Sequence, residues 1–148
     1  MAARKIEKLS NYSVVLIALL ALIVSIWQVR LFKNHNKLTV KPYLDSHVIQ
    51  QDSTLVVAFS NKGLGPAIIQ DMSYEVNGKE YSTVLELLRA EGDQENILST
   101  YNYQKGSVLS SNEEKIITEL KNPKFRGVTV RVEYQSIYEE KGEIEFTF

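Results

Sequence analysis

The string from Asn61 to Ala67 (NKGLGPA) has the most distinctive chemistry in this sequence of 148 residues. Its G-x-G spacing is part of the fingerprint with which glycine-rich loops bind dinucleotide phosphates. That fingerprint needs a third glycine where Ile68 stands, and a helix where the sequence instead reads as a strand. We therefore interpret the string as a structural turn in which the glycines take positive φ angles and Asn61 binds the turn backbone. The motif consists of Asn61, Gly63, Gly65, Pro66 and Ala67.

Asp45 and His47 are the other residues whose types and spacing could do chemistry. Two residues apart in a strand, they share a face, which suits an acid–base pair. Polar alternation on a solvent-facing strand gives the same pattern, so we favour a surface role. Carboxylate pairs such as Glu113-Glu114 flank predicted turns, where charged side chains are ordinarily solvated. With no cysteine and only two histidines, the sequence predicts no catalytic residue, no metal site and no cofactor.

The elements that position these residues fall into two parts of opposite charge. Residues 1–41 carry seven basic side chains and one acidic one, whereas residues 42–148 carry ten basic and seventeen acidic. The net charge of −1 hides this contrast and gives no bias toward nucleic acid. A length of 148 residues with 44% apolar content predicts a single folded domain behind a basic, apolar segment.

Residues 9–29 contain no charged side chain and predict a membrane-spanning helix over residues 9–30. At 1.5 Å per residue this run is about 31 Å long, close to the thickness of a bilayer's hydrocarbon core. A cleaved signal peptide would have a shorter apolar run and a small-x-small site, which Ser25-Ile26-Trp27-Gln28 does not offer. Aromatic and basic residues are expected at the two interfaces: Tyr12, Trp27, Arg30 and Lys33.

The charges that flank this helix decide its predicted orientation, and they are nearly balanced. A short basic tail, residues 1–8, precedes it, and a basic linker, residues 31–41, follows it. The closer packing of the tail charges favours the tail inside and the domain outside a bacterial inner or cell membrane. We interpret the linker as a solvated flank, the alternative being a segment that lies along anionic headgroups.

Residues 42–148 predict a mainly β domain. Val128, Val130, Val132 and Tyr134 alternate with polar residues, and Asn77-Gly78 is typical of a type I′ hairpin turn. About seven strands in this length favour an immunoglobulin-like β-sandwich, although the Cys…Trp…Cys core is missing. An open barrel is the alternative.

One segment of this domain has helical rather than strand spacing. Thr83 and Glu86 have the spacing of a capping box, which predicts one short helix over residues 84–91 that crosses between the sheets.

Behind a membrane anchor, the chain has Pro42, then a strand that ends in the turn motif followed by Ile69, and later the stretch of residues 134–138 (YQSIY). Together these resemble a group of small, uncharacterised bacterial membrane-anchored proteins. The resemblance covers the anchor and about a third of the domain. It implies an anchored β-sandwich with an N-x-G-x-G-P-A-x-I motif and carries over no catalytic residue.

We therefore predict a non-enzymatic, membrane-anchored binding or scaffold module. Its predicted partners are the lipid bilayer and another protein or an unidentified ligand, not nucleic acid. One alternative is an accessory subunit that acts through its helix, where Ala18, Ala21 and Ser25 form a stripe of small residues. A hydrolase or transferase that uses Asp45 and His47, or a carboxylate pair, is the least favoured interpretation.

Overall fold

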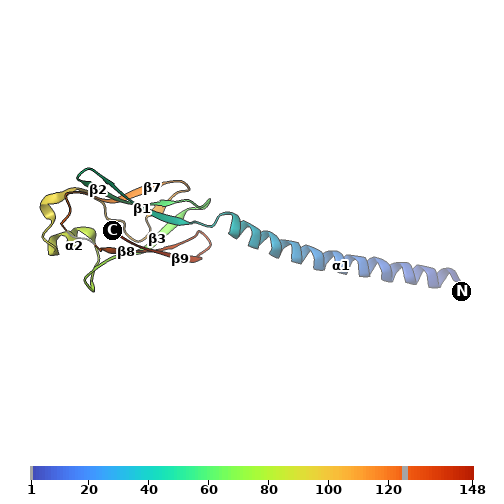
Figure 1. The fold of residues 1–148 in the computed structure, drawn as a ribbon. Coiled ribbons are helices and arrows are strands. Elements are labelled where there is room, and N and C mark those ends of the chain that lie inside the picture. The colour runs from blue at the N-terminus through green and yellow to red at the C-terminus, as the bar shows by residue number, and fades with distance from the viewer. Residues whose placement is uncertain (1, 125–126) are drawn as a thin grey trace. The chain divides into compact units, whose positions relative to one another are not determined.

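The computed structural model describes residues 2–124 and 127–148, with side chains from Tyr12 onward (Figure 1). The chain divides into two compact units, Met1–Leu38 and Thr39–Phe148. The first is a helix and the second is the β domain, so each is described by itself.

Helix α1 (Ala2–Thr39) contains the whole predicted membrane segment. It continues past residue 30, so the predicted linker, residues 31–41, is helical up to Thr39. The physical reason is that no glycine or proline interrupts the chain before Pro42, and a helix propagates at little cost until a breaker is met. Lys37 lies in the last turn, where a cation is favoured by the helix dipole.

Residues 40–148 form two antiparallel sheets, which confirms the mainly β, sandwich-like prediction (Figure 1). The first sheet has the order β1 (Leu44–Gln51), β2 (Thr54–Asn61), β7 (Glu114–Lys121) and β5 (Ile97–Thr100). The second has the order β4 (Lys79–Tyr81), β3 (Ala67–Val76), β8 (Thr129–Gln135) and β9 (Lys141–Thr147), and β6 (Val108–Leu109) also pairs with β3.

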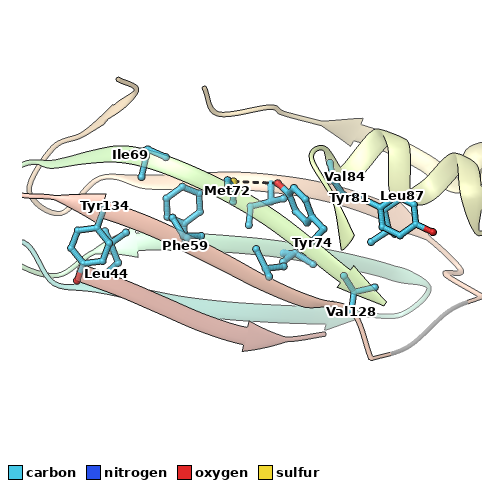
Figure 2. Packing of buried hydrophobic residues seen from close by; sticks show 14 of the residues in the cluster. Leu44, Phe59, Ile69, Met72, Tyr74, Tyr81, Val84, Leu87, Val128 and Tyr134 are labelled. Carbon is cyan, nitrogen blue, oxygen red and sulfur yellow. Dashed lines mark hydrogen bonds between the residues drawn. The ribbon is translucent and has the colours of Figure 1, made fainter. Parts of the chain in front are cut away.

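The core lies between these sheets and follows the period-two pattern of the strands (Figure 2). Val130 and Val132 of β8 are fully buried, as the alternation predicts. Phe59 of β2, in the other sheet, is fully buried in the same core, and Tyr74 of β3 donates a hydrogen bond to the sulfur of Met72 at 3.2 Å. Burial strongly raises the pKa of the Tyr74 phenol, because the charged form would lose its hydration there.

A short helix carries the chain from one sheet to the other. Helix α2 (Val84–Ala90) and the 3₁₀ turn η1 (Gln94–Asn96) lie between β4 and β5. The Thr83 hydroxyl accepts a hydrogen bond from the Glu86 amide, and the Glu86 carboxylate accepts one from the Ser82 amide. The first bond confirms the predicted cap by Thr83, whereas the return bond comes from the amide of Ser82, one residue before the N-cap, and not from that of Thr83.

The strand registers place several chain connections at one end of the sandwich. Leu44 of β1 pairs with Asn61 of β2, Ala67 of β3 pairs with Leu109 of β6, and Gln135 of β8 pairs with Lys141 of β9. We call this the proximal end, because the chain arrives there from α1. It is formed by a lead-in segment, residues 40–43, and by the loops of residues 61–66, 104–113 and 136–140.

Candidate functional site

The turn motif joins three parts of the proximal end through one buried amide. Asn61 is fully buried, and its Oδ1 accepts hydrogen bonds from the amides of Tyr43 at 3.1 Å and Gly63 at 3.0 Å. Its Nδ2 donates to the carbonyls of Gly65 at 2.7 Å and Leu109 at 3.2 Å. Asn61 therefore ties the lead-in segment, its own turn and β6 together, and its hydrogen-bonding capacity is used within the protein.

The two glycines of the motif are required by close backbone approach and not by positive φ. Neither Gly63 nor Gly65 lies in the positive-φ region, so that part of our prediction is wrong. A Cβ at Gly63 would lie 2.4 Å from the Lys41 carbonyl oxygen, and one at Gly65 would lie 1.7 Å from the Val40 carbonyl oxygen. The lead-in segment thus occupies the space that a side chain would need.

The remaining members of the motif start the next strand. Ala67 is the first residue of β3, is fully buried and pairs with Leu109, while Pro66 is half-buried just before it. The Ser111 hydroxyl donates to the Gly63 carbonyl at 2.8 Å, and the Asn112 amide donates to the Asn61 carbonyl at 2.8 Å. The motif is therefore packed against the turn before β7.

Asp45 and His47 do share a face of β1, and the structure adds a residue that the sequence did not point to. His47 Nε2 lies 3.2 Å from the Glu114 carboxylate of β7, so this pair spans β2 between them. The sequence predicts that Glu114 is one of two solvated carboxylates beside a turn. Local spacing gives no sign that it lies near His47, which is 67 residues earlier in the chain. The alternation of side chains along a strand predicts this neighbour only when the register between β2 and β7 is known.

Ser60 lies in register between Asp45 and Glu114, on the same face. Its hydroxyl is buried and has no hydrogen-bond partner among the described residues. A serine nucleophile needs an exposed Oγ that hydrogen-bonds a general base. The Ser60 hydroxyl meets neither condition, so it is not placed as a nucleophile.

A polar groove of about 750 Å³ lies on the second sheet, and no sequence motif indicated it. Asp71, Glu133 and Glu143 pair in one row across β3, β8 and β9. Arg131 Nε lies 2.9 Å from Glu143, and its Nη2 lies 2.9 Å from Glu145, so part of this acidic charge is neutralised. The groove is lined by Gln70, Asp71, Lys105, Glu133, Tyr134, Gln135, Lys141, Gly142 and Glu143. No group of three or more His, Asp or Glu side chains suited to a metal ion occurs among the described residues.

Two tyrosines that follow β5 differ in their roles. Tyr103 packs edge-on against Phe59, with ring centroids 5.5 Å apart, and its hydroxyl donates to the Ile116 carbonyl at 2.6 Å. Burial, helped by Tyr101 and Glu113, raises the Tyr103 pKa to about 12, so the phenol stays protonated and keeps donating. Tyr101 itself is half-exposed.

The predicted interface residues Tyr12, Trp27, Arg30 and Lys33 all lie in α1 and are exposed. The helix is long and apolar enough to cross a membrane over Tyr12–Thr39, and none of its apolar window is buried.

No protein-family model and no curated protein matches the chain.

Proposed function

We propose that the protein is a single-pass membrane protein whose β-sandwich is a binding or scaffold module. The observation that carries this proposal is the apolar run of α1. Its large side chains are exposed, for example Leu16 at 59% and Ile23 at 62%, which is costly in water and favourable in lipid.

The sandwich is proposed to be immunoglobulin-like. Its strand orders, β1-β2-β7-β5 and β4-β3-β8-β9, correspond to the orders A-B-E-D and C′-C-F-G of immunoglobulin domains. Domains of this architecture present loops at their ends for binding, which fits a module without a catalytic constellation. The resemblance to the small bacterial anchored proteins agrees with the same architecture and stays a prediction.

The proposed location is a bacterial inner or cell membrane with the sandwich outside. Its support is the close packing of Arg4, Lys5 and Lys8 in the short tail. The alternative is an accessory subunit that acts through α1. Its support is the stripe of small residues Ala18, Ala21 and Ser25, and one member of this stripe is already hydrogen-bonded within the helix. The Ser25 hydroxyl donates to the Ala21 carbonyl of its own helix at 2.8 Å and so has less to offer a neighbouring helix.

The experiment has two arms. In the first, membranes from cells that produce the full chain are washed with alkaline carbonate. The proposal expects the protein to stay in the membrane pellet, and release into the supernatant would refute the anchor.

In the second arm, a protease is added to intact spheroplasts that produce the chain with a C-terminal tag. Loss of the tag places the sandwich outside. Protection before lysis and cleavage after it would refute the proposed orientation and direct the search to cytoplasmic partners.

A further inference from the structure

We propose that the outer edge of β1 is the contact through which two copies of this chain associate, by antiparallel pairing of β1 with β1 of the second copy. The first sheets of the two copies then form one continuous sheet. This inference goes beyond the proposed function and needs only the β domain, whether or not α1 lies in a membrane.

The backbone groups of β1 alternate between its paired side and its outer side. β1 lies at the end of the first sheet, and β2 is the strand that pairs with it among the described residues. The Lys62 amide donates to the Tyr43 carbonyl just before β1 begins. Because hydrogen-bonded pairs alternate along an antiparallel ladder, the odd-numbered residues of β1 bond to β2. The amides and carbonyls of Ser46, Val48 and Gln50 therefore point to the outer side.

This outer side is open along the second half of the strand. Leu44 is buried, and Val48 and Gln50 lie on the same face of β1, yet Val48 is 40% exposed and Gln50 is exposed too. A cleft of about 410 Å³ lies beside these two side chains, with Leu55 and Phe148 in its other walls. The described residues therefore leave this half of the edge uncovered.

The other sheet edges are short or charged, whereas β1 is neither. β5 has four residues and a bulge, β4 has three and β6 has two. β9 is longer, but Lys141, Glu143 and Glu145 alternate along it. Short or charged edges are devices by which β proteins avoid edge-to-edge pairing. β1 has eight residues in unbroken register on β2, contains no proline or lysine, and exposes Val48 and Ile49.

The side chains of β1 match a second copy of the same strand. Its ionisable side chains are Asp45 and His47. Antiparallel pairing centred on Val48 places Val48 against its own counterpart and His47 against Ile49 of the second copy, so no like charges are opposed. A register centred on His47 pairs as many residues but opposes two imidazoles. We therefore commit to a second copy as the occupant, in the register centred on Val48.

The charge of the whole domain acts against this contact at long range. Residues 42–148 carry seventeen acidic and ten basic side chains, so two copies repel each other. Salt screens such repulsion beyond a Debye length, which is roughly 8 Å at physiological ionic strength. Pairing through backbone groups and apolar side chains should therefore become stronger as salt is added, whereas a contact held by ion pairs would become weaker.

The first test uses single cysteines, since the chain has none of its own. In the proposed register Val48→Cys meets its own counterpart with the Cα atoms about 5.5 Å apart, a separation that a disulfide spans. The matched control is Gln50→Cys, on the same edge and face. It lies opposite Ser46 of the second copy, so its two cysteines would be about 14 Å apart. The full chain is oxidised with copper phenanthroline in an excess of detergent micelles.

The expected result is a disulfide-linked dimer that forms several-fold faster for Val48→Cys than for Gln50→Cys, and faster still in high salt. Equal rates for the two variants, or no dimer with either, would overturn the proposal.

The second test blocks the edge without disturbing the domain. The Val48 amide points away from β2, so Val48→Pro removes a donor from the outer edge and no hydrogen bond between β1 and β2. The matched control, Val48→Thr, keeps the amide and the β-branched shape. Analytical ultracentrifugation of the full chain in detergent should show a dimer for the unchanged chain and for Val48→Thr, and a monomer for Val48→Pro. Circular dichroism checks that all three are folded.

Two further outcomes would overturn the proposal. A dimer that persists in Val48→Pro would place the association on another surface, such as α1. Cross-linking of Val48→Cys to a different protein in native membranes, without a dimer of the purified chain, would assign the edge to that protein.

Discussion

Removing the Asn61 amide should detach the lead-in segment from the sandwich. Asn61→Ala deletes four hydrogen bonds. The two that Asn61 donates, to the carbonyls of Gly65 and Leu109, are buried. The two that it accepts, from the amides of Tyr43 and Gly63, are part-buried. Each such bond contributes about 0.5–1.5 kcal/mol net, and each buried group left without a partner costs about 1–3 kcal/mol. We therefore expect the free energy of unfolding to fall by about 3–5 kcal/mol, a large share of the roughly 5–15 kcal/mol that a domain has.

The assay is urea denaturation of the full chain in a mild detergent, followed by far-ultraviolet circular dichroism, with hydrogen exchange of residues 40–44 as a local readout. The matched control is Lys62→Ala, an exposed neighbour in the same turn that should change stability by no more than about 0.5 kcal/mol. If Asn61→Ala and Lys62→Ala had the same denaturation midpoint and the same exchange at residues 40–44, the reasoning from the four hydrogen bonds would be refuted.

Three further predictions follow from the same packing. Gly65→Val should prevent the lead-in segment from docking, because even its Cβ would overlap the Val40 carbonyl. Its melting temperature should fall well below that of the exposed control in the same turn, and equal values would refute the close-approach argument. Gly142→Ala should cost about 1–3 kcal/mol, because its Cβ would lie 2.4 Å from the buried Tyr134 ring; an unchanged urea midpoint would show that the ring moves freely. The raised pKa of Tyr103 means that the unfolded chain loses this phenol's proton near pH 10 and the folded chain near pH 12. The free energy of unfolding should therefore fall as the pH rises from about 10 to about 12, and it should fall less steeply in Tyr103→Phe. Identical pH profiles of stability for the two proteins would contradict this.

Much of the β domain could be predicted because short-range rules dominate there. The alternation from Val128 to Tyr134 places one face in the core, as observed, and Asn77 and Gly78 both take the positive φ angles that the hairpin turn needs. The short helix starts at Val84 behind its cap, as predicted, and ends one residue earlier, at Ala90. The sequence shows no break signal between residue 30 and Pro42, and the helix continues to Thr39, since charge does not stop a helix.

The candidate sites depended on pairings far apart in sequence. The close packing of Gly65 could be predicted only from the position of Val40, and Glu114, the partner of His47, lies on the far side of β2. The groove around Glu133 needs the order β3-β8-β9. None of these follows from local spacing, because register between distant strands is set by how the whole sheet packs.

The antiparallel register of β1 also determines how the domain responds to mechanical load. Tension on the anchor would enter the sandwich at Val40 and reach the contacts of the lead-in segment with the Asn61 turn before it reaches β1. A pull along the axis of β1 then shears all of its pairs with β2, from Leu44↔Asn61 to Gln51↔Thr54, at once rather than one after another. The turn motif would thus yield first under force, and the sheet behind it would resist.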